Sequence, residues 1–235
     1  MPSRHELTLY ELAAADPALR FSPHCWKTRM ALAHKELEAE GLPWRFSDKQ
    51  VIAFSGQGRV PVLVDQGTVV ADSWRIALHL EERFPDRPSL FRSEECKPLA
   101  HFVNSWADSM LVPAIARIVL VDIYSRIDEK DKPYFRRSRE ERFGGRLEEV
   151  VADRPARLAD FRNALAPLRL MLQERPYIAG AAAGYADYCV FGMFMWIRCV
   201  SNTEVLEPAD PVAAWRARLL DAFGGMARSA PSVQL

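Results

Sequence analysis

The sequence predicts a two-part fold, in which a small unit of mixed strands and helices is followed by an all-helical unit. Three observations predict it. Residues 7–90 alternate β-branched runs with amphipathic runs. A proline-containing stretch, PDRPSLF (85–91), then interrupts the pattern. From about Glu94 onward the chain has helical periodicity and no convincing strand. We therefore expect one domain over residues 1–88 and a second over residues 89–235.

The first unit is predicted to begin with a strand, a helix and a second strand. LTLYEL (7–12) is a short apolar run that favours a strand. WKTRMALAHKEL (26–37) has apolar residues at helical spacing, namely Trp26, Met30, Ala33 and Leu37. LPWRFSD (42–48) is a second strand candidate. This order is that of a β-α-β unit, which favours parallel strands.

The same unit is predicted to end with a hairpin and a helix. VPVLVD (60–65) and TVVAD (68–72) are β-branched runs on either side of Gln66-Gly67, which is typical of a tight hairpin. DSWRIALHLEERF (72–84) is an amphipathic helix candidate that stops at Pro85. The helices are expected to cover the sheet.

Three features define the helical unit. Apolar stripes at helical spacing are predicted for Trp106, Met110 and Ile115, and for Leu158, Phe161, Leu165, Leu168 and Leu172. ADYCVFGMFMWIRCV (186–200) is apolar on nearly every side, which predicts a buried helix. The mixed-charge stretch from Asp128 to Arg157 is interpreted as solvated helix surface.

Composition argues against several classes of protein. The 235 residues are 49% hydrophobic and 26% charged, and 31 basic residues balance 31 acidic ones, so no basic excess indicates nucleic acid or an anionic membrane. The longest apolar run, YCVFGMFMWI (188–197), is shorter than the about 20 residues of a membrane span. The first ten residues have no apolar core, so we expect no secretory signal and a cytoplasmic location.

A metal site is not expected from the sequence. The four cysteines, Cys25, Cys96, Cys189 and Cys199, form no Cys-x-x-Cys pair and pair with no histidine at zinc-finger spacing. The histidines form no His-Glu-x-x-His motif.

The segment SPHC (22–25) has the form of a Cys-Pro-x-Cys redox turn in which serine replaces the first cysteine. Ser22 and Pro23 suit the N-cap and first position of a helix, and helix capping alone is a sufficient explanation of them. Alternatively, the Ser22 hydroxyl can donate a hydrogen bond to the thiolate of a ligand at the positive end of the helix. A free thiol has a pKa of about 8.5, and helix ends or donors lower it. Cys25 has no partner in the turn and is interpreted as a small buried hydrophobic residue.

Two further segments suit a peptide-like ligand. Pro61 follows Val60 at a strand entry, which indicates either an edge or a cis peptide bond. A cis bond would leave the Val60 N–H and C=O free to pair with a peptide. Asp72-Ser73 opens a helix, so it is a helix cap, and it also suits the carboxylate and ammonium groups of an α-amino acid.

Together, in this order, these segments resemble the glutathione-binding half of the glutathione transferase family, and the resemblance covers essentially the whole chain. It implies a thioredoxin-like α/β domain followed by an all-α domain, with the linker at residues 85–91 and glutathione as the co-substrate. SPHCWKTRMALAHK, DSW, PYFRRSREERFG (133–144) and YADYCVFGMFMWIRC look like the serine-type branch of bacterial lignin β-etherases and related fungal transferases.

The resemblance implies a role for each site residue. Ser22 is the thiol-activating, catalytic residue. Val60 and Pro61 pair with the cysteinyl backbone of glutathione, and Asp72 with Ser73 holds its γ-glutamyl end. Arg59, with Lys49 or Gln57 as weaker candidates, meets the glycyl carboxylate. Pro23, His24 and Tyr124 are substrate-pocket candidates, with a core role for Tyr124 as an equal alternative.

One position departs from the family pattern. Gly184 stands where Ser or Thr often precedes Asp187 by three residues, so the capping box is incomplete, and we expect slower folding or lower stability.

Four functions remain open from the sequence. The first is thiolate attack on an aromatic electrophile, including cleavage of a β-aryl ether. The others are general detoxifying conjugation, non-catalytic binding of aromatic compounds and a Cys25-based oxidoreductase. A homodimer formed across the joint between the domains is expected from the resemblance, with glutathione and a small aromatic substrate as partners.

Overall fold

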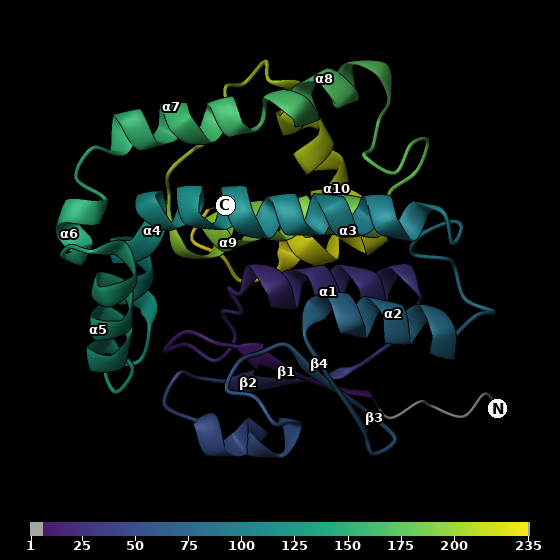
Figure 1. The fold of residues 1–235 in the computed structure, drawn as a ribbon, viewed down its shortest axis with the longest axis horizontal. Coiled ribbons are helices and arrows are strands. Elements are labelled where there is room, and N and C mark those ends of the chain that lie inside the picture. The colour runs from purple at the N-terminus through teal and green to yellow at the C-terminus, as the bar shows by residue number, and fades with distance from the viewer. Residues whose placement is uncertain (1–6, 235) are drawn as a thin grey trace.

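The computed structural model describes residues 7–234 and has a mixed sheet below a helical layer (Figure 1). The first unit contains β1 (Leu7–Leu12), α1 (Pro23–His34), β2 (Glu40–Trp44), a 3₁₀ segment (Lys49–Ser55), β3 (Val62–Asp65), β4 (Thr68–Ala71) and α2 (Ser73–Arg83). The strand order is β2-β1-β3-β4, with β1 and β2 parallel and the other neighbours antiparallel. This confirms the predicted β-α-β and β-β-α units.

The hairpin between β3 and β4 turns at Gln66-Gly67, as predicted. Both residues have positive φ, 48° and 89°, which is the conformation of a two-residue hairpin turn whose twist matches that of the strands. The second strand is earlier than predicted: it covers 40–44 rather than 42–48. The reason is tertiary, because the backbone N–H groups of Phe46 and Ser47 bind the Asp131 carboxylate at 3.1 and 2.7 Å, away from the sheet.

The second unit is helical throughout its regular elements among the described residues. It contains α3 (Cys96–Trp106), a π-helical turn (Ala107–Leu111), α4 (Val112–Arg126), α5 (Lys132–Phe143), α6 (Leu147–Val150), α7 (Arg154–Ala164), α8 (Ala166–Glu174), α9 (Tyr185–Val200) and α10 (Pro211–Ser229). The proline-containing stretch 85–91 lies between α2 and α3, where the linker is expected.

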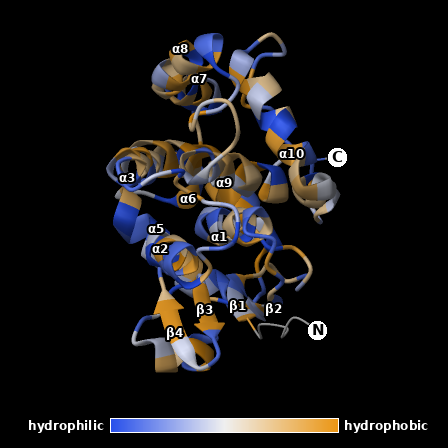
Figure 2. Cartoon of the chain, turned by 90° about the vertical axis from the view of Figure 1, so that its right-hand side faces the viewer, coloured by the Kyte–Doolittle hydropathy of each residue, from blue (hydrophilic) through white to orange (hydrophobic). Residues whose placement is uncertain are grey.

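Helix α9 is the centre of the core, as its composition predicts. Almost all of its residues are buried, and Figure 2 shows hydrophobic colouring along it. It packs closely on α1, since a Cβ at Gly192 would lie 2.4 Å from the carbonyl oxygen of Pro23. Glycine is therefore required at the contact that joins the two units.

The start of α9 explains the departure at Gly184. The Gly184 N–H donates to Asp187 Oδ2 at 3.1 Å, so one half of the capping box is present. A Cβ at position 184 would lie 2.9 Å from the Ala179 Cβ and 3.1 Å from the Leu90 oxygen, so a serine or threonine would require the backbone to shift. Asp187 also accepts hydrogen bonds from Ile178, Ala179 and the Trp215 indole. The expected loss of stability stays a prediction.

Two predictions for the helical unit were wrong in part. Met110 does not share a buried stripe with Ile115, because the π-helical turn changes the helical phase; Met110 is 54% exposed and Ile115 is fully buried. The stretch 128–157 is not uniformly solvated surface, since Asp131 and Phe135 are buried.

Among residues 7–234, no helix is both long and apolar enough to cross a membrane. The prediction that the chain lacks a secretory signal concerns residues 1–10, of which 1–6 lie outside the described residues.

Candidate active site between the sheet and the helical unit

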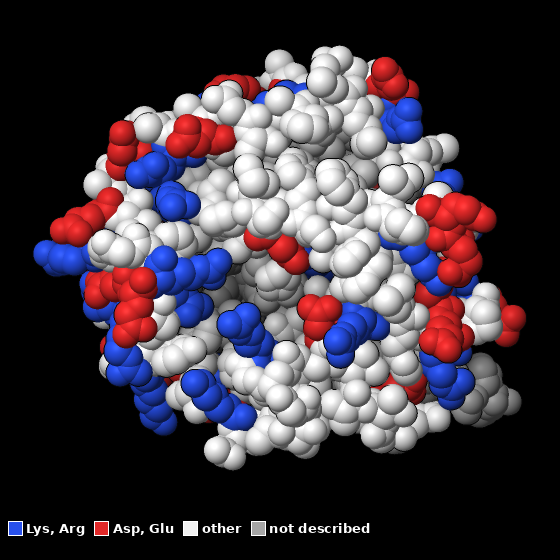
Figure 3. Space-filling view, in the orientation of Figure 1, with Lys and Arg blue, Asp and Glu red and all other residues white. Residues whose placement is uncertain are grey.

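A cavity of about 280 Å³ lies between the two units, in front of the N-terminus of α1. Its walls come from the end of β1, the start of α1, the segment before β3, and helices α4, α5 and α9. The residues that line it are Leu12, Phe21, Ser22, Pro23, His24, Trp44, Phe46, Gly58, Arg59, Val60, Val112, Ala116, Leu120, Ile123, Tyr134, Phe135, Arg139, Arg142, Phe143 and Trp196. Figure 3 shows a hollow on this face, with basic side chains along one edge and acidic side chains along another.

Ser22 is the N-cap of α1 and also lines the cavity. Its Oγ accepts a hydrogen bond from the Cys25 N–H at 3.3 Å, and Pro23 follows at the first helical position. A hydroxyl that accepts at the cap keeps its own hydrogen to donate elsewhere. Capping and donation to a ligand are therefore compatible at this residue.

Cys25 lies behind Ser22 and does not face the cavity. It is fully buried, and burial raises the pKa of its thiol to about 12. Cys189 and Cys199 are buried and free as well. The Cys25 thiol is therefore in its protonated form at neutral pH.

Val60 precedes a cis peptide bond to Pro61, which decides between the two alternatives left open by the sequence. Among the described residues, neither the N–H nor the C=O of Val60 makes a backbone hydrogen bond. Val60 and Arg59 both line the cavity. The local geometry therefore presents an unpaired peptide group beside Ser22.

Asp72 caps α2 through one carboxylate oxygen. Its Oδ1 accepts from the Trp74 and Arg75 N–H groups at 3.0 and 3.2 Å, and its φ is 83°. Ser73 is buried, and its carbonyl oxygen accepts a hydrogen bond from the Tyr185 hydroxyl at 2.7 Å. This bond fixes the start of α2 against α9.

The His24 imidazole is influenced by charged groups from both the start of α1 and the start of α2. Desolvation and the Lys27 ammonium lower the pKa of its imidazole, although a third of the side chain is exposed, and Asp108, Asp72 and Arg59 also act on it. The groups beside α1 and α2 are therefore close enough to influence the same imidazole.

The remaining predicted site residues lie outside the cavity lining. Pro61, Asp72 and Ser73 are not among its lining residues, and neither are Lys49 and Gln57. Tyr124 is also absent from the lining. Its ring lies under the Arg136 guanidinium at 4.6 Å and packs on Phe135, so the core role is the better description.

The sequence did not indicate a buried polar cluster beside the cavity. The Lys27 ammonium is fully buried and donates to Asn104 Oδ1 at 2.8 Å and to Asp108 Oδ1 at 2.6 Å. Asp108 lies in the π-helical turn, which carries its carboxylate to α1. The spacing of these residues along the chain contains no signal of this contact.

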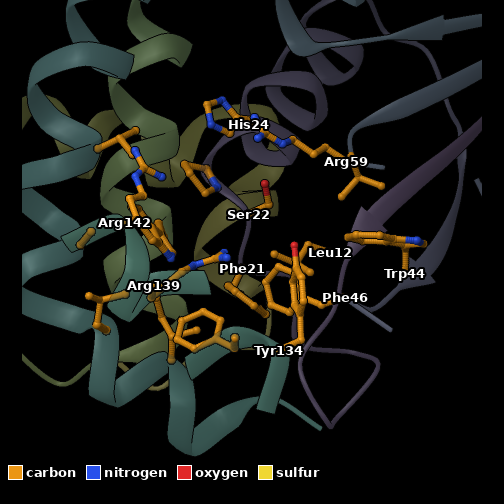
Figure 4. A pocket seen from close by; sticks show the side chains of 18 of the residues that line it. Leu12, Phe21, Ser22, His24, Trp44, Phe46, Arg59, Tyr134, Arg139 and Arg142 are labelled. Carbon is orange, nitrogen blue, oxygen red and sulfur yellow. The ribbon is translucent and has the colours of Figure 1, made fainter. Parts of the chain in front are cut away.

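The sequence also did not assign the basic side chains of α5 to the cavity. Arg139 and Arg142 line it together with Tyr134 and Phe46, and Figure 4 shows Arg139 extending from α5 toward the space near Phe21 and Tyr134. Arg139 and Arg142 belong to the stretch interpreted as solvent-exposed. That interpretation was wrong for Arg139, which is half-buried, whereas Arg142 is exposed as expected and also lines the cavity. The repeated Arg and aromatic residues in PYFRRSREERF are the only signal that could have indicated them.

Comparison with known proteins identifies the architecture. Residues 21–83 match the model of the glutathione S-transferase N-terminal domain, and residues 98–223 match that of the C-terminal domain. A curated relative, the glutathione S-transferase-like protein ustS of Aspergillus flavus, is 28% identical over 139 residues, 53% of this chain and 49% of its own. The chain spans about half the length of the curated relatives it matches.

Solved structures resemble the whole chain. Glutathione transferase GSTFuA3 from Phanerochaete chrysosporium is 25% identical with a TM-score of 0.82, covering 92% of this chain and 97% of its own. CsGST63524 of Ceriporiopsis subvermispora, solved in complex with glutathione, is 24% identical with a TM-score of 0.79 over 93% and 96%. The β-etherase LigF from a Sphingobium strain shares the fold at 19% identity, with a TM-score of 0.68 over 92% and 95%. With its thioredoxin-like sheet domain and helical domain, this chain belongs to the glutathione S-transferase family.

Proposed function

We propose that the chain is a glutathione transferase that uses the glutathione thiolate as a nucleophile on aromatic electrophiles. The observation that carries the proposal is the Ser22 hydroxyl, which faces an aromatic-lined cavity at the N-terminus of α1 with its hydrogen available for donation. The hydroxyl and the helix dipole together stabilise a thiolate, because both place positive charge at this point.

Glutathione is held along the segments around Ser22. The Val60 N–H and C=O pair with its cysteinyl backbone, with Pro61 holding the turn. The free carboxylate oxygen of Asp72 binds the γ-glutamyl ammonium, and Ser73 binds the adjacent carboxylate. Arg59 binds the glycyl carboxylate, since a guanidinium forms paired hydrogen bonds with that group. The sulfur then lies near Ser22.

The reaction is nucleophilic displacement. The thiol proton passes to solvent when the thiolate forms, and the sulfur then attacks the electrophilic carbon. An S–C bond forms, and the leaving group departs with the bonding electron pair. The chemistry requires no metal and no protein thiol, which agrees with the buried, protonated state of Cys25.

A narrower form of the proposal is cleavage of β-aryl ethers of the lignin type, in which the leaving group is a phenolate on a carbon next to a carbonyl. The segment PYFRRSREERFG supports it by resemblance, and its Tyr134, Phe135 and Arg139 line the cavity. The alternatives are general detoxifying conjugation and non-catalytic binding of aromatic compounds. We also propose a cytoplasmic homodimer. The exposed apolar side chains Leu99 and Phe102 on α3, 69% and 72% exposed, support association.

The test uses two electrophiles with the wild-type protein and glutathione. 1-Chloro-2,4-dinitrobenzene reports conjugation by absorbance, and a β-aryl ether dimer reports ether cleavage by release of free phenol. Turnover of both supports the narrow form, and turnover of the first alone supports general conjugation. If neither reacts while calorimetry shows that glutathione binds, the proposal of a transferase is wrong.

A further inference from the structure

The cavity in front of Ser22 has an excess of positive charge. Three arginines line it, Arg59, Arg139 and Arg142, and no aspartate or glutamate is among its lining residues. Asp108 is the acid beside His24, and it is engaged by the Lys27 ammonium at 2.6 Å. The positive charge of the three guanidinium groups is therefore not balanced within the cavity wall.

Arg139 and Arg142 lie three residues apart on α5, which places them on one face of the helix. Neither forms an ion pair with a residue in the described range 7–234. Arg136 on the same helix shows the contrast, because Glu140 and Glu148 bind it at 3.0 and 2.8 Å. Arg136 does not line the cavity and is paired with carboxylates. Arg139 and Arg142 do line the cavity and are paired with none in the described range.

The surroundings hold Arg139 in place. Its guanidinium lies 4.6 Å from the centre of the Phe135 ring and 5.2 Å from that of Phe46. Burial lowers the pKa of Arg139, and the nearby Arg142 and Arg59 charges act in the same direction. Arginine nevertheless stays charged at neutral pH. A half-buried, stacked cation of this kind gains most from an anion that reaches it.

Arg59 has an anionic partner under the proposed function, the glycyl carboxylate. Arg139 donates to Ser138 Oγ at 2.9 Å, but neither Arg139 nor Arg142 binds a carboxylate of the described residues. The same space has aromatic walls. Phe46 and Tyr134 line it (Figure 4), and Trp196 is a further lining residue. We propose that the electrophile is an aromatic acid, whose ring packs on these walls and whose carboxylate binds Arg139 and Arg142. This inference rests on the proposed function and names its substrate class.

The reaction step stays a simple displacement. With 4-chloro-3-nitrobenzoate as the probe, the glutathione sulfur forms a bond to the carbon that carries chlorine, the C–Cl bond breaks, and chloride leaves with the electron pair. The carboxylate takes no part in bonding changes. It orients the ring so that the reacting carbon faces the sulfur.

The experiment compares this acid with its neutral analogue, 4-chloro-3-nitrobenzamide, each corrected for its uncatalysed rate with glutathione. Wild type is expected to prefer the acid. Arg139→Gln and Arg142→Gln are each expected to lower kcat/KM for the acid by about tenfold to a hundredfold, mainly through KM, because each loses hydrogen bonds to a charged group. In the same variants, kcat/KM for the amide is expected to change by less than about twofold. Arg139→Lys keeps the positive charge, so its kcat/KM for the acid is expected to fall less than that of Arg139→Gln.

Arg137→Gln is the matched control, because Arg137 is exposed on the same helix and does not line the cavity. This variant removes the same charge and is expected to leave kcat/KM unchanged for both electrophiles. If it lowers the rate with the acid as much as Arg139→Gln does, the effect is one of net charge and the inference is wrong. The inference is also wrong if Arg139→Gln and Arg142→Gln weaken glutathione binding itself by the same factor.

Failure of the inference differs from failure of the proposed function. Equal turnover of acid and amide by wild type overturns the inference and leaves the transferase in place. If neither is turned over, calorimetry with the two S-aryl glutathione conjugates decides. Tighter binding of the carboxylate conjugate, lost in Arg139→Gln, supports the inference, and equal affinities overturn it.

Discussion

At the scale of single residues, Ser22 and Cys25 occupy the two cysteine positions of a redox turn but do not share its chemistry. Ser22 caps α1 with its oxygen and keeps a hydrogen for the ligand, while Cys25 is buried with a thiol pKa of about 12. A thiol with that pKa is almost wholly protonated at neutral pH, so it cannot act as the nucleophile. The sulfur that reacts must therefore come from the ligand.

Ser22→Ala is expected to lower the transfer rate by about 10²–10³, because one well-placed donor to a developing charge is lost. The pKa of bound glutathione thiol should rise toward about 8.5, so activity at neutral pH falls and recovers as the pH rises. Affinity for glutathione should change little. A pH titration of thiolate absorbance in both complexes checks this, and coinciding curves with intact turnover would reduce Ser22 to a helix cap.

Cys25→Ala is the matched control at the same turn. It is expected to keep most of the glutathione-dependent activity and to lower the free energy of unfolding by about 1–2 kcal/mol, since a buried sulfur is removed. Steady-state kinetics and urea unfolding measure the two effects. Complete loss of activity in a folded Cys25→Ala protein would instead favour the thiol oxidoreductase.

At the scale of elements, Asp72 at the start of α2 both caps the helix and is proposed to bind the ligand. Asp72 Oδ1 accepts two backbone N–H groups, which caps the helix, and the other oxygen remains for a ligand. Ser73 is buried and tied through its carbonyl oxygen to Tyr185. Substitution at position 72 therefore changes both the stability of the helix and the negative charge that the protein presents to the ligand, unless a variant changes only one of them.

Asp72→Asn and Asp72→Ala separate them. Asparagine caps helices about as well as aspartate, so Asp72→Asn should unfold near the wild-type urea concentration, while Asp72→Ala should lose about 1 kcal/mol. Both should weaken glutathione binding by about tenfold or more, since each loses a charged partner of the ammonium. Calorimetry that finds wild-type affinity in Asp72→Asn would remove Asp72 from the glutathione site.

At the scale of the whole molecule, an ion pair with one buried partner joins the two units. Lys27 of α1 is fully buried and reaches Asp108 and Asn104 of the helical unit, while the Asp108 side chain is 36% exposed. Removing one partner of such a pair is costly chiefly for the group left buried without a counter-charge. The two ends of this pair are therefore not equivalent.

Asp108→Ala is expected to destabilise the protein by about 1–3 kcal/mol, because it leaves the buried Lys27 ammonium with Asn104 but without a carboxylate. Lys27→Met should cost less, since Asp108 can be hydrated and the methionine fills the same space. Urea unfolding of both variants measures the difference. Equal losses, or a larger loss in Lys27→Met, would contradict this account of the interface.

Much of the architecture followed from local patterns. Strand β1, the Gln66-Gly67 hairpin and the buried helix α9 depend on hydrophobic periodicity and turn chemistry, which act over a few residues and are readable in the sequence. The N-cap residues Ser22 and Asp72 were equally predictable, since capping is a contact between residues two or three apart.

The tertiary structure decided what local patterns could not contain. Asp131 ends β2 early by binding the N–H groups of Phe46 and Ser47, which lie more than eighty residues away in the chain. Tyr124 packs under Arg136, whereas Arg139, one turn further along α5, lines the cavity. A run of charges has the same composition whether it faces water or a ligand. Which face of α5 meets the cavity depends on its packing against α4 and α6, and that orientation determines which arginines can meet a substrate.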